Sequence, residues 1–169
     1  MADFGFPFKT PPELHWSGGS RFFGSSRGKR KHGGCDLIKP PYEQIYAVAD
    51  GTLVQEEKHF YLGTYYVTYQ HGTILVRYGE IDVKSSTRTK AGQTIKKGEP
   101  LAKVGLMFTN KKMTVRHDPK GPKGHMLHIE VYTKGSDHSG LWSDKGPYNR
   151  RADVTDPAPY LDKWVLDLP

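Results

Sequence analysis

The chain has 169 residues and a mass of 19.1 kDa, which suits one domain that buries its own hydrophobic core. Its single cysteine, Cys35, excludes an internal disulfide, and no apolar run approaches the length of a membrane span. The formal net charge of +7 favours an anionic partner, such as nucleic acid, a membrane surface or an acidic wall polymer, although solubility alone also accounts for it.

The composition predicts a mainly β fold. The 19 glycines, 12 prolines and 10 tyrosines indicate many turns and strands rather than a helix bundle. We expect residues 1–169 to form a single domain, with residues 1–20 as an irregular segment that packs aromatic side chains onto it. The first residues, with Asp3 and two prolines by position 11, do not resemble a signal peptide, so we expect synthesis in the cytoplasm.

The first strands are predicted between turn signals. A short strand over residues 35–38 follows a pair of glycines. A second strand, over residues 45–49, ends at Asp50-Gly51, a dipeptide typical of hairpin turns, and residues 52–54 continue beyond it. We therefore expect a hairpin at this dipeptide.

The middle of the chain predicts a second hairpin and a pair of short strands. Residues 64–70 and 73–81 flank His71-Gly72, which supplies the turn of that hairpin. Residues 92–105 form two short strands around a Lys-Gly pair. The long basic loop over residues 106–124 is typical of a lid or groove wall, because loops of this length in small domains are usually functional.

The C-terminal third holds a strand and a short helix. The strand covers residues 126–132 and is followed by a glycine-rich polar loop. Asp156 can cap a helix whose first turn contains Pro157. Three apolar residues would share one face of this helix: Tyr160, Leu161 and Trp164.

Three residues far apart in the sequence can bind a metal ion together. His32 and Asp36 are separated by two glycines and a cysteine, so a tight turn can aim both side chains at one point. Alternation along 126–132 turns His128 away from the aliphatic side chains of that strand. Two histidines and a carboxylate are a ligand set of catalytic zinc, which keeps a fourth position open for water. For each residue taken alone, a structural or solvated side chain is the more common role.

Two further residues need an explanation. Glu80 ends an apolar stripe, where a carboxylate is costly unless it is paired, metal-linked or already in water at the strand end. Cys35 could add a thiolate ligand, but that would close the zinc site, and a small buried residue is the better interpretation.

The order of these features resembles the lysostaphin-type zinc endopeptidases, which cut peptide cross-links in peptidoglycan. The family's H-x-x-x-D pattern corresponds to His32-Gly-Gly-Cys-Asp36, and its glycine-bounded hairpin to Gly92–Gly98. Its last strand corresponds to Leu127–Glu130, and its closing segment to Asp156–Leu161. The similarity runs from about residue 20 to residue 164.

The resemblance implies a fold, a cofactor and an activity. The fold is a groove over antiparallel sheets, of the duplicated hybrid motif type, and the cofactor is Zn²⁺ held by His32, Asp36 and His128. The activity is hydrolysis of a peptidoglycan amide by metal-activated water. Glu130, on the same strand face as His128, is either a partner of that ligand or exposed.

Two positions depart from the family pattern. The family usually has one histidine at the end of the middle strand and another two residues before the last ligand, where this chain has Glu80 and Met126. Glu80 is the predicted general base, and His125 could supply a second catalytic group if a bulge turns it inward, with His117 a weaker candidate. Losing one positioned acid or base costs roughly 10²–10⁴-fold in rate.

These observations leave two principal functions. The first is an active zinc endopeptidase acting on peptidoglycan, delivered to the periplasm or cell wall as a phage lytic enzyme or an injected antibacterial toxin, in which case a cognate inhibitor should exist. The second is a non-catalytic, zinc-containing module that binds wall peptide or a protein partner. Nucleic-acid binding is third, because the basic run lacks interleaved aromatics and a helical reading element.

Overall fold

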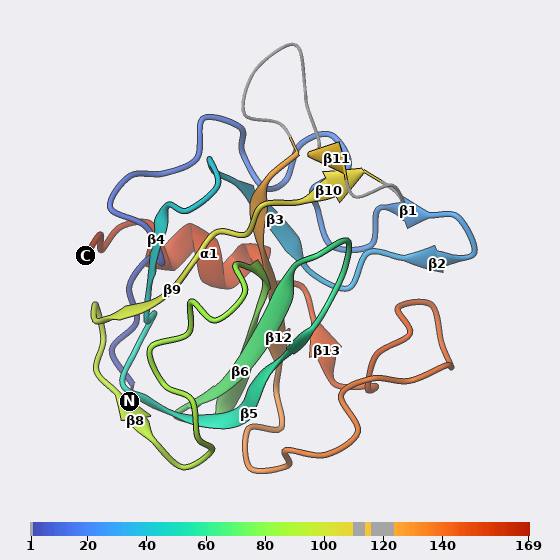
Figure 1. Cartoon of the computed structure of the whole chain (residues 1–169). Helices are drawn as coiled ribbons and strands as arrows, with labels where there is room; N and C mark the ends of the chain where they lie inside the picture. Colours follow the sequence, from blue (N-terminus) through green and yellow to red (C-terminus); the bar gives the residue numbers. More distant parts are fainter. Residues whose placement is uncertain (1, 110–113, 116–123) are drawn as a thin grey trace.

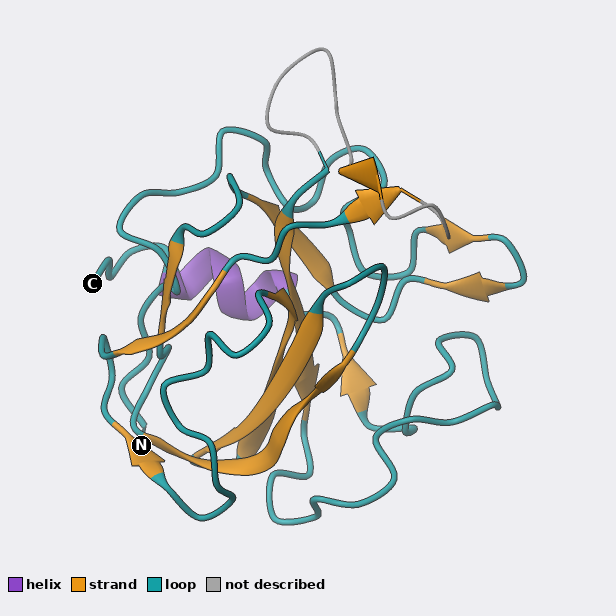
Figure 2. Cartoon of the chain, in the orientation of Figure 1, coloured by secondary structure: helices purple, strands orange, loops and turns teal. Residues whose placement is uncertain are grey.

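The computed structural model describes residues 2–109, 114–115 and 124–169 of the chain. Strands dominate these residues, and the one helix among them lies near the C-terminus (Figures 1 and 2). The elements are β1 (Ser26–Arg27), β2 (Arg30–Lys31), β3 (Cys35–Ile38), β4 (Gln44–Tyr46), β5 (Gly51–His59), β6 (Tyr65–His71), β7 (Ile74–Ile81), β8 (Thr94–Ile95), β9 (Pro100–Lys103), β10 (Phe108–Thr109), β11 (Thr114–Val115), β12 (Met126–Tyr132), β13 (Val154–Thr155) and α1 (Ala158–Trp164). The predicted mainly β fold with a short C-terminal helix is therefore confirmed.

An antiparallel sheet organises the molecule. Its strands are hydrogen-bonded in the order β13, β12, β7, β6, β5 and β8, and β3 also pairs with β12. The hairpin expected around His71-Gly72 is formed by β6 and β7, with Tyr65 opposite Ile81 at one end and His71 opposite Ile74 at the other. The strand predicted over 126–132 is β12, which lies inside the sheet and contacts both β3 and β7.

The hydrophobic core takes the side chains that alternation predicted for it. Cys35 and Leu37 of β3 are fully buried, as are the aliphatic residues of β12. The N-terminal segment adds aromatic rings to the same core: Phe6, Phe8 and Trp16. Because successive strand residues project to opposite faces, the residues between them, Asp36 and His128, are turned away from this core.

The C-terminal helix begins one residue later than expected. Its N-cap is Pro157, which makes no side-chain capping hydrogen bond. The predicted cap, Asp156, lies one residue earlier, and its Oδ1 accepts the backbone N–H of Ala158 at 2.9 Å, so it still satisfies a donor of the first turn. The predicted apolar face packs into the core through Tyr160, Leu161 and Trp164.

The hairpin predicted at Asp50-Gly51 is wrong. β4 is short and pairs with β9, whereas β5 pairs with β6 and β8, so the strands on either side of the dipeptide are not partners. The Asp50 carboxylate accepts hydrogen bonds from Lys97 N–H at 2.9 Å and Lys96 Nζ at 2.8 Å. The turn is thus tied to the segment between β8 and β9, a non-local pairing that a local turn signal does not reveal.

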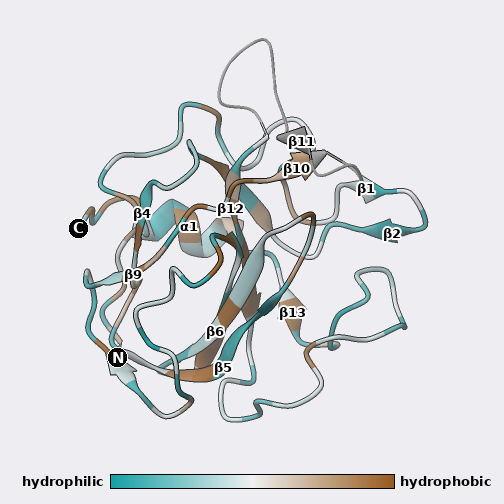
Figure 3. Cartoon of the chain, in the orientation of Figure 1, coloured by the Kyte–Doolittle hydropathy of each residue, from teal (hydrophilic) through white to brown (hydrophobic). Residues whose placement is uncertain are grey.

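The two strands expected within 92–105 are β8 and β9. In the predicted loop over 106–124, β10 and β11 pair with each other, while residues 110–113 and 116–123, including His117, lie outside the described residues. The β1–β2 hairpin is hydrophilic along its length (Figure 3). In the described part of the chain, no helix has the length and apolar character needed to cross a membrane.

Candidate metal centre

The sheet register places two of the expected ligands side by side. In β12, His128 is paired with Asp36 of β3 on one side and with Gly79 of β7 on the other. Directly opposite residues in adjacent strands project from the same face, with Cβ atoms about 4.5–5.5 Å apart. Asp36 and His128 therefore meet on the face of the sheet that is turned away from the aliphatic core.

The glycine pair before β3 brings in His32. Its backbone is anchored to the segment before it, because His32 N–H donates to Ser25 O at 2.8 Å and its carbonyl accepts Gly24 N–H at 2.8 Å. At Gly34 the chain passes so close to β12 that a Cβ would lie 2.2 Å from Ile129 O and 2.8 Å from His128 Cε1. Only a residue without a side chain fits there.

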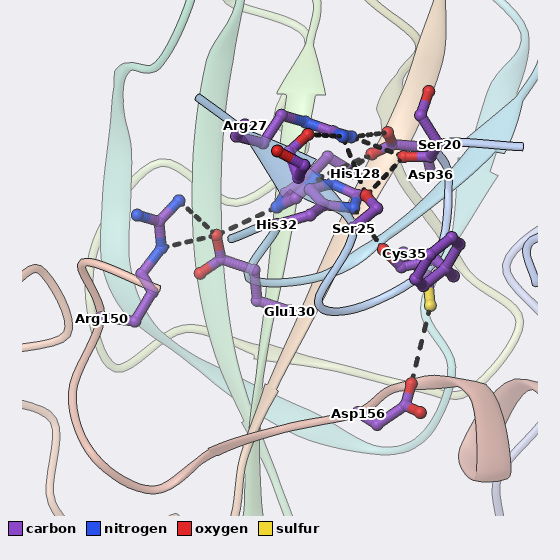
Figure 4. A network of polar contacts seen from close by, with 12 residues as sticks. Ser20, Ser25, Arg27, His32, Cys35, Asp36, His128, Glu130, Arg150 and Asp156 are labelled. Atoms are coloured by element: carbon purple, nitrogen blue, oxygen red, sulfur yellow. Dashed lines mark hydrogen bonds and ion pairs between the residues drawn. The ribbon is translucent and has the colours of Figure 1, made fainter. Parts of the chain in front are cut away.

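Three potential ligand atoms converge on one point (Figure 4). His32 Nε2 lies 3.1 Å from Asp36 Oδ1 and 3.1 Å from His128 Nδ1, and the last two atoms are 2.8 Å apart. All three side chains are buried. Atoms at these separations can be bonded at once by an ion whose ligand distances are about 2.0–2.2 Å, as for zinc. The structure thus brings together the three predicted ligands.

Hydrogen bonds on the far side of each ring fix the histidine tautomers. His32 Nδ1 lies 2.9 Å from Phe22 O and His128 Nε2 lies 3.0 Å from Glu130 Oε1, and both oxygens can only accept. Each of these nitrogens therefore carries the hydrogen, which leaves His32 Nε2 and His128 Nδ1 with lone pairs in the neutral rings. With the Asp36 oxygen, three electron-rich atoms then face one another, an arrangement that either a proton or a metal ion between them stabilises.

Glu130 is the buried partner of His128. It is completely inaccessible, which rules out the exposed alternative considered from the sequence. Its carboxylate also pairs with Arg77 Nη1 at 3.1 Å and with Arg150 Nη2 at 2.7 Å, and it accepts the hydroxyl of Tyr132. Burial alone would raise its pKa, but Arg77, the hydrogen bond from His128 and Arg150 together hold the pKa well below its usual value. Glu130 therefore stays ionised.

The protonation of the cluster follows from the same contacts. Burial by itself disfavours the charged form of His128, but hydrogen bonds to Asp36 and Glu130 outweigh it and raise its pKa to about 9. Burial lowers the pKa of His32. Burial would raise the pKa of Asp36, yet its hydrogen bonds with both histidines hold it below the usual range. These atoms accordingly hold either a proton or a metal ion.

Glu80 is turned towards the cluster by a β-bulge. Tyr65 pairs with Ile81 and Tyr66 with Gly79, so Glu80 is the extra residue of β7. Its φ of 59° is in the left-handed region, where residues other than glycine are uncommon. As a result Glu80 leaves the stripe formed by its neighbours and lines a cleft together with the three converging side chains.

That cleft has a volume of about 720 Å³ and a mixed lining. Arginines gather on its wall: Arg27, Arg30 and Arg150. Aromatic side chains line it as well: Phe60, Tyr61 and Trp142. Arg150 stacks on Trp142, with its guanidinium carbon 3.9 Å from the ring centroid, so the wall is fixed by packing as well as by charge.

The model of peptidase family M23 matches residues 30–139, which is more than half of the chain and contains the whole cluster. The chain belongs to peptidase family M23. The resemblance to lysostaphin-type enzymes is therefore confirmed at the level of the family.

Named relatives of this M23 chain come from bacteria. Peptidoglycan DD-endopeptidase ShyA of Vibrio cholerae is 30% identical over 105 residues, which are 62% of this chain and 21% of ShyA. Lysostaphin from Staphylococcus simulans superposes with a TM-score of 0.52 at 15% identity, covering 96% of this chain and 51% of lysostaphin. A zinc-containing peptidase from Vibrio cholerae gives 0.54 at 21% identity, covering 98% and 41%. The chain spans about a fifth of the length of the curated relatives it matches.

Two neighbouring residues, His125 and Met126, bear on the second catalytic group of this M23 chain. Met126 lines the cleft, but a thioether cannot relay a proton. His125 is buried, its Nδ1 accepts Met107 N–H at 3.1 Å, and it does not belong to the described lining of the cleft. Its catalytic role remains a prediction, as does that of Glu80.

Sequence reasoning missed the arginines around Glu130. Arg77 interrupts the apolar run of β7 and is completely buried, and Arg150 lies in the polar loop before β13. A charged residue in the middle of an apolar strand was the available signal for Arg77, because such a charge needs a buried partner. The loop position of Arg150 carried no comparable signal.

Proposed function

We propose that this M23 chain is a zinc-dependent endopeptidase that hydrolyses peptide cross-links or stem peptides of peptidoglycan. One observation carries the proposal: three lone-pair atoms of His32, Asp36 and His128 meet at 2.8–3.1 Å beside an open cleft. Two relatives support the choice of substrate and metal. ShyA is described as a peptidoglycan DD-endopeptidase, and the Vibrio cholerae structure as a zinc-containing peptidase.

The residues divide the chemistry between them. When bound, zinc supplies Lewis-acid polarisation of the scissile carbonyl and acidifies water. Glu80, on the cleft wall, accepts a proton from the attacking water and returns it to the departing amine. Glu130 holds the His128 ring in one orientation, and its two arginine partners keep it charged.

The alternative is a zinc-containing binding module on the same fold that does not catalyse hydrolysis. Met126 favours it, because it lines the cleft at a position where the resemblance to lysostaphin-type enzymes implies a histidine. Such a module would keep the metal cluster and the cleft while lacking one catalytic group.

The test compares metal content with cleavage in the same preparation. Purified chain loaded with zinc is incubated with peptidoglycan, and released muropeptides are analysed by mass spectrometry beside His128→Ala and Glu80→Gln variants. We expect cleavage by the native chain, its loss on chelation, its return with zinc, and little cleavage by either variant. Native protein that contains one zinc per chain and leaves every peptide bond intact would leave the binding module as the function.

A further inference from the structure

Two arginines face each other in the hairpin that leads into the metal cluster. Arg27 of β1 is paired directly with Arg30 of β2, so both side chains project from the same face, and both line the cleft. The turn between them contains Gly28, whose φ is 69°. Like charges directly opposite in a sheet repel. A binding role would explain why both are aimed into one cleft.

The first arginine already has protein partners. Arg27 Nη2 lies 3.3 Å from Asp36 Oδ2 and 2.7 Å from Ser20 O, and its Nη1 lies 2.8 Å from Ser25 Oγ (Figure 4). It therefore holds the oxygen of Asp36 that is turned away from His32 and His128. Arg27 positions a ligand and has little capacity left for another anion.

The second arginine has none of these contacts. Over the described residues, the Arg30 guanidinium makes no hydrogen bond and no ion pair, although the side chain is half-buried in the cleft. A guanidinium that is crowded by like charges and turned into a cleft is ready to bind an anion.

The charges around it point to the kind of anion. Two of the three arginines on the cleft wall already pair with carboxylates, Arg27 with Asp36 and Arg150 with Glu130, whereas Arg30 has no such pair among the described residues. A divalent cation at the cluster would add further positive charge. A peptide substrate can balance this excess with a carboxylate, whose two oxygens match the fork of a guanidinium. We propose that Arg30 binds a free carboxylate of the substrate peptide beside the amide that is cut, which makes that carboxylate a specificity determinant. This inference rests on the proposed peptidase function.

The experiment uses two synthetic cross-linked stem peptides that differ in one group. In one peptide the carboxyl group next to the cross-link is free, and in the other it is a carboxamide. The zinc-loaded chain is tested for kcat/KM by chromatography and for Kd by calorimetry. The native chain should prefer the carboxylate peptide by about 10- to 100-fold, the range for a hydrogen bond to a charged group.

Variants assign the preference to Arg30. Arg30→Gln should reduce the preference to about one-fold, and Arg30→Lys should keep part of it, because charge remains while the fork is lost. The matched control is Lys29→Gln, which removes one positive charge from the exposed turn outside the cleft and should keep the full preference. Thermal unfolding of each variant confirms that the hairpin change leaves the fold intact.

The outcomes separate the two proposals. A native chain that cuts both peptides equally well overturns the carboxylate site and leaves the peptidase in place. A chain that cuts neither peptide, yet binds the carboxylate form more tightly in an Arg30-dependent manner, overturns the peptidase and leaves the site. A carboxylate preference that survives in Arg30→Gln, or no binding of either peptide, also overturns the site.

Discussion

His128 and Glu130, two residues apart on β12, are joined by a contact of 3.0 Å between Nε2 and Oε1. Alternation along a strand puts both side chains on one face, so the ligand and its partner come from the same short segment. Glu130 has no exposed surface, and two arginines pair with its carboxylate: Arg77 at Oε2, and Arg150 at Oε1, the oxygen that also contacts His128. The arrangement places a buried negative charge behind the imidazole of a candidate metal ligand, which fixes the orientation of the ring and raises its basicity.

Glu130→Gln should weaken zinc binding. A neutral amide no longer favours the same tautomer and basicity of His128, so we expect zinc affinity to fall by roughly 10- to 100-fold. The change also leaves Arg77 and Arg150 without their anion, so the variant should unfold at a lower temperature. Competition with a chelating dye measures the affinity.

The control for this prediction is Tyr132→Phe. It removes the hydroxyl that Glu130 accepts but leaves the carboxylate charged and in place. Zinc affinity should then stay close to that of the native chain. Equal affinities for the native chain and Glu130→Gln would contradict a role for Glu130 in holding the metal ligand.

Gly34→Ala should abolish the metal site. The added Cβ would lie 2.2 Å from Ile129 O, which belongs to the backbone of β12 and cannot move aside without disturbing the sheet. We expect loss of zinc binding together with a lower melting temperature. Gly33→Ala is the comparison, since its Cβ would meet Arg150 Cγ at 3.2 Å, a contact that a shift of a few tenths of an ångström relieves, so zinc binding should fall much less. Normal zinc binding by Gly34→Ala would show that the close approach is not required.

Glu80→Gln should lower kcat by about 10²- to 10⁴-fold, the usual effect of losing a positioned general base. Zinc content should stay unchanged, because the converging ligand atoms come from three other residues. His125→Gln tests the other predicted catalytic group in parallel. A Glu80→Gln enzyme with native kcat would exclude Glu80 as the base. A large loss of kcat in His125→Gln would then indicate that His125 is the catalytic group.

The expected place of action can be tested in cells. A chain directed to the periplasm should lyse a Gram-negative host, and the same chain kept in the cytoplasm should be harmless, because peptidoglycan lies outside the inner membrane. The control is periplasmic His128→Ala, which lacks a ligand and should be tolerated. Equal toxicity from both compartments would contradict an action on the cell wall and the delivery routes proposed from the sequence.

The convergence of His32, Asp36 and His128 could be predicted from the sequence because it depends on local rules, a two-glycine turn and strand alternation, which were read together with the resemblance to the lysostaphin-type enzymes. The position of Glu130 was ambiguous because its countercharges come from residues 53 and 20 positions away in the sequence. The orientation of the Glu80 side chain depends on a β-bulge, in which β7 has one residue more than the facing part of β6. Such a bulge has no clear signature in the sequence.

His71 illustrates a histidine whose role is structural. Its side chain is completely buried at the end of β6. Tyr78 OH lies 3.0 Å from His71 Nε2 and accepts Val48 N–H at 3.2 Å, so the hydroxyl donates to the ring. His71 Nδ1 is 3.2 Å from Asp50 O and is the donor there. The neutral ring therefore satisfies both contacts, and burial lowers its pKa to about 4.

This buried ring should make the fold less stable in mild acid. His71 takes up a proton near pH 6.5 in the unfolded chain and only near pH 4 in the folded chain. Its contribution to the free energy of unfolding is therefore fully present above pH 6.5 and is lost as the pH drops towards 4. The free energy of unfolding should decrease by up to about 3 kcal/mol over this range. Urea titrations at several pH values measure it for the native chain and for His71→Gln. The variant should be less stable at pH 7 but should lack this part of the pH dependence, so parallel curves for the two proteins would contradict the assignment.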